Sequence, residues 1–342
     1  MLPIIYYNLE TKSQTIMRLQ ILTERSRVEG CSFIKHYKFD IGHTVPIYDV
    51  STMNALNQII GHVKFQNANY GNVFYRGVGG LYKNVLPALM RERAKGIPND
   101  LCQTLNSIIN DSYFKESLKL FNPVVPRTDK DYYFNKMVTR YNKYCAEALL
   151  QHYAGSTRFL DVVDNHWVAL WMGLHEFKRH GKGNKFYHST RKSLSAWDLY
   201  EAHIGNNGDV MNRDIYTYIL LIAMPYPKST PNYGISETED FVEVDLRKAL
   251  PSIYLRPHAQ HALVIRRRDK GNIEQKAEYY DMASQVTAIL RVRIDRVAKW
   301  LGEGTLLTQE NLFPSPSIDQ GYNNLLMHSE TFKEPFDIKK YF

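Results

Sequence analysis

The chain has 342 residues, of which 44% are hydrophobic and 13% aromatic, so it can form a packed core and is not wholly disordered. Its 43 Lys and Arg residues exceed its 35 Asp and Glu residues, and the net charge of +8 suits a polyanionic partner or an anionic cofactor. The cysteines (Cys31, Cys102 and Cys145) are too far apart for a disulfide framework or a zinc site. No apolar run reaches the roughly 18 residues of a membrane helix, and the first residues do not resemble a signal peptide, so we expect a cytoplasmic protein without membrane contact.

The first 44 residues mix basic and aromatic side chains, which indicates either a short extension of a sheet or an arm that binds a partner. The pattern then predicts a helix over 53–63, capped by Asp49 or Ser51. A short buried strand over 73–77 follows and ends in Arg76 and Gly77. The glycines that follow lack a Lys-Ser or Lys-Thr pair, which excludes a P-loop.

Residues 151–161 are the most polar stretch between two predicted helices, and read Gln-His-Tyr-Ala-Gly-Ser-Thr-Arg-Phe-Leu-Asp. Helical spacing of buried residues covers 141–152 before this stretch. It covers 167–177 after it, where Asp164 or Asn165 caps the helix and Gly181 stops it. Because each unpaired polar group between buried helices costs about 1–3 kcal/mol, these groups either satisfy one another or hold a ligand.

The second half of the chain is rich in predicted strands. Apolar or alternating runs cover 185–188, 215–224, 241–245, 261–265 and 285–294, and helices are expected over 195–203 and 295–302. Helices therefore come first and strands mostly later. This order predicts an α+β fold, with a helical first half packed on a central mixed or antiparallel β-sheet.

Several of these segments occur in the order of one family. The chain has Phe74-Tyr75-Arg76-Gly77, the 151–161 core, Val168-Ala169-Leu170-Trp171-Met172, Arg256-Pro257-His258-Ala259-Gln260 and Leu312-Phe313-Pro314. In this it resembles the FRG domain family, named for Phe-Arg-Gly, whose core reads Gln-His-Tyr-Gly-x-Pro-Thr-Arg-Leu-Leu-Asp. The resemblance spans about residues 50–325. We therefore expect an N-terminal extension (1–44), an FRG-like domain (45–325) and a C-terminal tail (326–342).

The chain departs from the family pattern at several places. Tyr75 stands within Phe-Arg-Gly, and residues 154–156 replace Gly-x-Pro. Val162 replaces the usual Trp after Asp161, and Ala262 stands where the family has a glycine. These departures mark a divergent member.

The resemblance implies a bacterial toxin or antiphage effector, distantly similar to ADP-ribosyltransferases and their split β-sheet. It implies NAD as co-substrate, and a possible antitoxin or chaperone as protein partner. Arg76 and Gly77 would then hold the pyrophosphate, and Tyr75, Tyr153 or His152 would stack on a ring. The candidate cofactor-binding residues are Tyr75, Arg76, Gly77, Tyr153 and Thr157. Asp161, Gln260 or Glu201 would bind ribose hydroxyls or orient a nucleophile.

The candidate catalytic residues are Arg76, His152, Arg158, Asp161 and Gln260. The excess positive charge favours RNA or DNA as acceptor, with Arg91, Arg93, Arg266, Arg267 and Arg268 as phosphate contacts. Neither a His-Glu-x-x-His nor a Cys-x-x-Cys motif is present, so no metal is expected.

Three structural interpretations and two other functions remain open. Arg158 and Asp161 would form an internal ion pair, Gln151 and Thr157 would cap helices, and His152 would be a core histidine. The chain would then be a non-catalytic module that binds nucleic acid or protein. Alternatively it is a metal-independent ribonuclease, with His152 or His258 as base and Arg158 stabilising the phosphorane.

Overall fold

The computed structural model describes residues 18–23, 28–94, 144–153, 157–180, 185–191, 215–227, 234–250, 252–270, 276–327 and 340–341. The predicted helix 195–203, Glu201, Cys102, residues 154–156 and the side chain of Arg93 lie outside this description. In the described part of the chain, no helix is long and apolar enough to cross a lipid bilayer.

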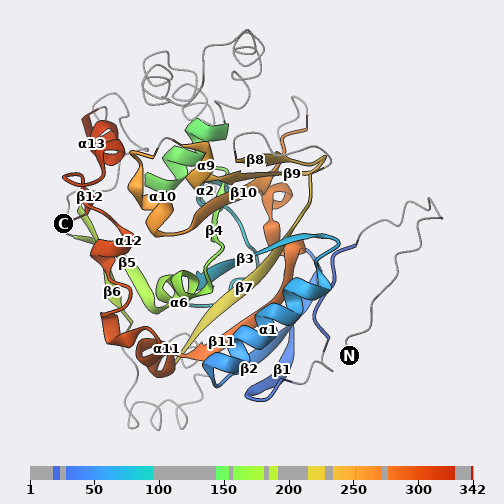
Figure 1. The fold of residues 1–342 in the computed structure, drawn as a ribbon. Helices are drawn as coiled ribbons and strands as arrows, with labels where there is room; N and C mark the ends of the chain where they lie inside the picture. Colours follow the sequence, from blue (N-terminus) through green and yellow to red (C-terminus); the bar gives the residue numbers. More distant parts are fainter. Residues whose placement is uncertain are drawn as a thin grey trace, which may run out of the picture.

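A nine-stranded sheet forms the centre of the fold, in the order β1-β2-β11-β7-β3-β4-β10-β9-β8 (Figure 1). Its strands are β1 (Cys31–Lys38), β2 (Thr44–Val50), β3 (Gly71–Val78), β4 (Leu160–Val163), β7 (Tyr216–Pro225), β8 (Ile235–Glu237), β9 (Phe241–Asp245), β10 (Ala262–Arg267) and β11 (Val286–Arg293). β2 and β11 pair in parallel, and the other neighbours in this sheet pair antiparallel. The prediction of an α+β fold with a mixed central sheet is confirmed.

A second sheet and the helices complete the architecture. The second sheet has the order β12-β6-β5, formed by β5 (His175–His180), β6 (Lys185–Thr190) and β12 (Lys340–Tyr341). The helices are α1 (Met53–Gln66), α2 (Ala88–Ala94), α6 (His166–Leu174), α9 (Leu246–Ala249), α10 (Leu255–Ala259), α11 (Ile294–Trp300), α12 (Gln309–Leu312) and α13 (Gln320–Met327), with short 3₁₀ turns η1 (Ala277–Tyr280), η2 (Met282–Gln285) and η3 (Gly302–Gly304). Residues 144–153 are also helical.

Four strands of the large sheet come from the first half of the chain, so the prediction that helices precede strands is only partly right. β1 lies in the segment expected as an extension and pairs with β2 at the edge of the sheet. Its residues alternate between half-buried and exposed along much of its length, because an edge strand packs on one side only. Its apolar signal in the sequence is therefore weak.

Two helices differ from their predicted ends. α1 is capped by Thr52, whose Oγ1 accepts a hydrogen bond from the amide of Ala55 at 3.1 Å, and not by Asp49 or Ser51. α6 is capped by Asn165 as expected, but it ends at Leu174 and not near Gly181. The chain turns directly into β5, where His175 pairs with Thr190 and Phe177 with His188. Phe177 therefore lies on a strand.

The large sheet consists of two halves that meet at one residue pair. β3 pairs with β7 along its whole length, and β4 pairs with β10 along its whole length. Between β3 and β4 the only paired residues are Tyr75 and Val163. We call β1-β2-β11-β7-β3 the first half-sheet and β4-β10-β9-β8 the second half-sheet.

Three apolar clusters hold the half-sheets together. A shared cluster covers one face of both halves and includes Phe74, Leu160, Val162, Leu220 and Ile265. The opposite face carries two separate clusters, one against α6 over the first half-sheet and one against helix 144–153 over the second. The two separate clusters leave a boundary at β4, where Asp161 points to their face because side chains alternate along a strand.

Arg256 ties the second half-sheet to the C-terminal helices. Its guanidinium carbon lies 4.4 Å from the ring centroid of Tyr153 and 4.5 Å from that of Tyr322. Asp319 Oδ2 accepts hydrogen bonds from the Arg256 amide at 3.1 Å and from the Tyr153 hydroxyl at 2.6 Å. The Arg256 side chain is therefore a buried structural contact.

A buried network of charges joins helix 144–153 to β10. Arg158 forms an ion pair with Glu147 at 2.7 Å and a longer one with Asp269 at 3.3 Å. Arg266 pairs with the same Asp269 at 3.2 Å. Burial raises the pKa of Glu147, but the guanidinium groups of Arg158 and Arg266 outweigh it and hold that pKa below its ordinary value. The predicted ion pair between Arg158 and Asp161 is wrong, because Arg158 turns toward Glu147 and Asp269.

We predict that Glu147→Gln lowers the free energy of unfolding by about 3–5 kcal/mol at pH 7, because it leaves buried guanidinium groups without their carboxylate. The pKa of Glu147 is lowered in the folded state, so its stabilisation is present above the unfolded pKa of about 4.3 and is lost as pH falls through the folded value. Urea unfolding should therefore show a difference between wild type and variant that shrinks below about pH 4. Glu310→Gln, on the exposed side of α12, should cause no comparable loss. An equal loss in both variants would contradict this account.

Candidate functional site

Two cavities adjoin at the open end between β3 and β4. The first has a volume of about 330 Å³ and the second about 650 Å³, both within the roughly 300–1,000 Å³ typical of small-molecule sites. The second is lined by members of the shared cluster, among them Phe39, Val85 and Leu220. Both are lined by Arg76, Gly77, Arg91, Leu160 and Met172. One ligand can therefore contact both cavities at Arg76.

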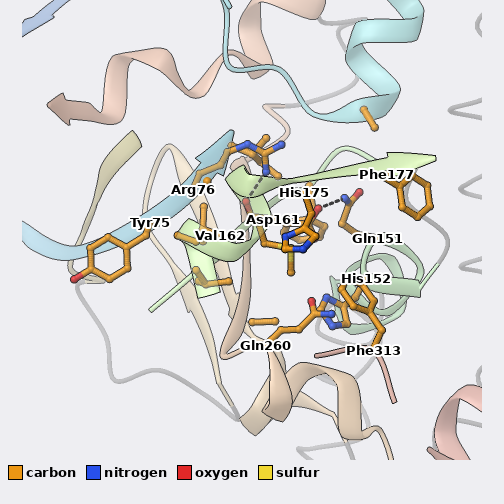
Figure 2. A pocket seen from close by; sticks show the side chains of 18 of the residues that line it. Tyr75, Arg76, Gln151, His152, Asp161, Val162, His175, Phe177, Gln260 and Phe313 are labelled. Carbon is orange, nitrogen blue, oxygen red and sulfur yellow. Dashed lines mark hydrogen bonds between the residues drawn. The ribbon is translucent and has the colours of Figure 1, made fainter. Parts of the chain in front are cut away.

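Arg76 occupies the opening between the half-sheets. Its Nη1 donates a hydrogen bond to the backbone carbonyl of Asp161 at 2.6 Å (Figure 2). Burial lowers the pKa of Arg76 from 12.5 to about 10; nearby Asp161 opposes this shift and Arg91 adds to it. Arg76 is still a cation at neutral pH, in a place where a bound anion would stabilise its charge.

Gly77 is required by packing. A Cβ at this position would lie 1.7 Å from the carbonyl oxygen of Ala169 in α6. This close approach of β3 and α6 accounts for the glycine without a ligand. It also fixes α6 as one wall of the first cavity, through Ala169 and Met172.

The side chains of Gln151, Thr157 and Asp161 form one hydrogen-bonded chain. Gln151 Nε2 donates to Asp161 Oδ2 at 2.6 Å, and the Thr157 hydroxyl donates to Gln151 Oε1 at 2.7 Å. Thr157 Oγ1 also accepts from the amide of Phe159 at 3.1 Å, but the strand β4 follows and not a helix, so the prediction that Thr157 caps a helix is wrong. Gln151 was expected to cap a helix as well, but both ends of its amide bind side chains.

His152 and Gln260 lie on the wall of the first cavity with Asp161. His152 is 8% exposed, and Gln260 donates from Nε2 to the carbonyl of Leu312 at 2.7 Å. Gln260 is the C-cap of α10 and precedes β10. The structure thus brings together four of the five candidate catalytic residues: Arg76, His152, Asp161 and Gln260.

Of the remaining candidates, Tyr75 lines the first cavity, whereas Tyr153, Thr157 and Arg158 line neither. The ring of Tyr75 points away from the first cavity, packs edge-on against His166 and lies beneath the Lys64 ammonium (Figure 2). Tyr153 and Thr157 are fully buried, and Arg158 belongs to the charge network with Glu147. None of these positions suits the ring-stacking, phosphate-binding or catalytic roles expected for them.

The candidate nucleic-acid contacts differ in their exposure to solvent. Arg91 is exposed and lines both cavities. Arg266 is 2% exposed and bound to Asp269, so it cannot serve as a surface contact. Arg267 is half-buried over the ring of Phe241 at 4.9 Å, and Arg268 donates to the carbonyl of Thr238 at 3.3 Å.

The sequence interpretation missed an aromatic and imidazole wall of the first cavity. His175 stacks on Trp171 with centroids 3.9 Å apart, and His188 lies 4.4 Å from Phe313. Burial lowers the pKa of His175, so this imidazole is neutral at pH 7. The four-residue spacing of Trp171 and His175 was visible, but placing His188 required the pairing of β5 with β6.

Among the described residues, no three His, Cys, Asp or Glu side chains gather as a metal site.

Gly77→Ala should destabilise the protein by about 3 kcal/mol or more, because the added methyl group meets a backbone carbonyl that cannot rotate away. Gly61→Ala is the matched control, since Gly61 is an exposed position of α1 with no atom near the added Cβ. That change should stabilise by about 0.5–1 kcal/mol. Urea unfolding of both variants tests the pair, and a stable Gly77→Ala protein would show that β3 and α6 are not held this closely.

The comparisons with known proteins identify one family. Residues 71–182 match the model of the FRG domain. Neither the curated proteins nor the solved structures contain a match to the chain. The matched segment includes Arg76, Gln151, His152 and Asp161, which surround the first cavity. The chain therefore contains an FRG domain, whose matched segment begins with β3 and ends just after β5.

Proposed function

We propose that this FRG domain transfers ADP-ribose from NAD to a nucleic acid, as a toxin or antiphage effector of the cytoplasm. The observation that carries the proposal is the charge pattern where the two cavities adjoin. Arg76 and Arg91 line both cavities, and Asp161 is the one carboxylate that lines either of them in the described part of the chain. NAD needs this pattern, because its pyrophosphate is anionic and its ribose becomes cationic during transfer.

The two arginines suit a pyrophosphate. Arg91 lies close enough to Arg76 to lower its pKa, so the two cations repel each other. A dianion between them removes this repulsion and accepts hydrogen bonds from both guanidinium groups. A monoanion would compensate only half of the charge.

The difference between the cavities supports one orientation of the dinucleotide. The second cavity is larger, mostly apolar, and carries Gly79, Gly80 and Asn84, which suits an adenosine. The first cavity carries the carboxylate of Asp161, the amide of Gln260 and the rings of His175 and Phe313. It suits the nicotinamide riboside, since the carboxylate then lies near the reacting ribose.

The proposed reaction breaks the bond between ribose C1′ and the nicotinamide nitrogen. Nicotinamide leaves with the electron pair, and the positive charge that develops on the ribose is stabilised by Asp161. A nucleophilic nitrogen or oxygen of the acceptor then bonds to C1′ and releases its proton to solvent or to Asp161. The basic net charge of the chain and the exposed Arg91 support a nucleic acid as acceptor.

The position of Arg158 does not support the ribonuclease alternative. Arg158 is bound to Glu147 and Asp269 and lines neither cavity, so it does not face His152 across a substrate site. A ribonuclease would have to use Arg76 or Arg91 with His152. This outcome remains distinguishable, because such an enzyme cleaves RNA without NAD.

Arg91→Ala should weaken NAD binding about 10- to 100-fold, because a charge-assisted hydrogen bond to phosphate contributes about 1.5–3 kcal/mol. Arg91→Lys should restore part of this affinity through its charge. Arg296→Ala, on α11 and away from both cavities, is the matched control and should bind NAD like wild type. Calorimetry measures all four proteins. If wild type binds no NAD, the proposed function is wrong.

Asp161→Asn should retain NAD affinity within a few-fold and lose transfer by about 100-fold or more, because the amide oxygen can still accept from Gln151 while the charge is gone. The assay incubates labelled NAD with RNA, single-stranded DNA, duplex DNA or lysate protein. Label on one polymer identifies the acceptor class. Unchanged transfer in Asp161→Asn would remove Asp161 from the chemistry, and NAD binding without any cleavage would indicate a non-catalytic binding module.

A further inference from the structure

We propose that Gln151 is a positioning residue that fixes the orientation of the Asp161 carboxylate. The proposal rests on the proposed function in one respect, since it takes Asp161 as the carboxylate that faces the ribose. It adds a residue whose own side chain does not need to touch the reacting atoms. It also gives the buried Thr157 a part in the site.

The geometry of Gln151 is that of a fixed support. The side chain is 5% exposed, and both ends of its amide are engaged at 2.6 and 2.7 Å. Thr157, which binds the far end, is fully buried. A buried amide with both ends bound has lost its rotational freedom, so it holds the carboxylate in one direction.

The Phe159 amide sets the direction in which the hydrogen bonds among Thr157, Gln151 and Asp161 run. The Phe159 amide can only donate, and Thr157 Oγ1 accepts this hydrogen bond. The Thr157 hydroxyl then donates its proton to Gln151 Oε1, which turns Nε2 toward Asp161. The opposite orientation would place the amide oxygen against a carboxylate oxygen.

Asp161 is anchored at two atoms by two elements. Its backbone carbonyl accepts from Arg76 on β3, and its Oδ2 accepts from Gln151 on helix 144–153 (Figure 2). Within the described residues no donor binds its Oδ1. Because Asp161 lines the first cavity, Oδ1 is the oxygen available to a ligand there.

Two substitutions separate positioning from simple packing. Gln151→Leu keeps the approximate volume and removes the donor, so kcat for transfer should fall about 10- to 100-fold while KM for NAD stays within a few-fold. Gln151→Glu places a second carboxyl group at hydrogen-bond distance from Asp161. Two such groups share one proton near neutral pH, so the acidic limb of the kcat profile should move up by about one pH unit or more.

The control is Gln285→Glu. Gln285 is also a buried amide, 7% exposed, and its Oε1 accepts from the Tyr70 hydroxyl at 2.7 Å, but it lines neither cavity. The Gln285→Glu variant also buries a new carboxyl group, so it should destabilise the fold to a similar degree. It should leave the pH profile of transfer unchanged. A profile that moves equally in both variants, or in neither, would overturn the positioning role.

Failure of the proposed function is recognised separately. If wild type neither binds nor cleaves NAD, the proposed function fails whatever Gln151 does. The contact is then tested by urea unfolding of Gln151→Leu, Asp161→Leu and the double variant. A coupled pair gives a double variant whose midpoint falls by less than the sum of the single changes, whereas additive midpoints would overturn the contact itself.

Discussion

The hydrogen bond from Arg76 to the carbonyl of Asp161 spans the one place where the large sheet is almost interrupted. Beyond Tyr75 and Val163 the two strands diverge, so their facing backbone groups lose the ladder partners that a continuous sheet provides. An unpaired backbone group inside a protein is costly, and a guanidinium with its several donors is well suited to cover such a gap. The same divergence creates the space of the two cavities. One structural constraint thus explains both a charged residue at the end of a buried strand and the two cavities beside it.

The 151–161 stretch contains residues of two kinds. Gln151, His152 and Asp161 line the first cavity, whereas Tyr153, Thr157 and Arg158 are held within the protein by Asp319, Gln151 and Glu147. The second group determines where the first group lies. A substitution at Arg158 or Tyr153 would therefore disturb the wall of the first cavity through the fold, so a loss of the proposed activity in such a variant would not identify a catalytic group.

Much of the fold was predictable because local patterns carry it. The ten-residue apolar run of β7, the alternation of β11 and the apolar face of helix 144–153 are periodic signals that a single sequence contains. The partners of charged residues were not predictable in this way. Arg158 lies three residues from Asp161, yet it pairs with Glu147, eleven residues away, and with Asp269, 111 residues away. Proximity in sequence favours a pair between Arg158 and Asp161. The direction in which the backbone leaves helix 144–153 instead brings Arg158 to Glu147 and Asp269. The hydrogen bonds from Thr157 to Gln151 and from Gln151 to Asp161 were missed for the same reason. The predicted role of Gln151 as a helix cap took only backbone partners into account.

The narrow junction is tolerable because other interactions keep the half-sheets together. The shared cluster continues from Phe74 on β3 to Leu160 and Ile265 on the second half-sheet, and so covers the gap from one side. On the other side, the close contact of Gly77 with Ala169 fixes α6 against the first half-sheet. The Glu147 network fixes helix 144–153 against the second. With both walls set independently, the distance between Arg76 and the side chains of the opposite wall does not depend on strand pairing. Arg76 and Asp161 are then held at fixed positions by their own hydrogen bonds, so a ligand of matching charge would bind without first reorganising them.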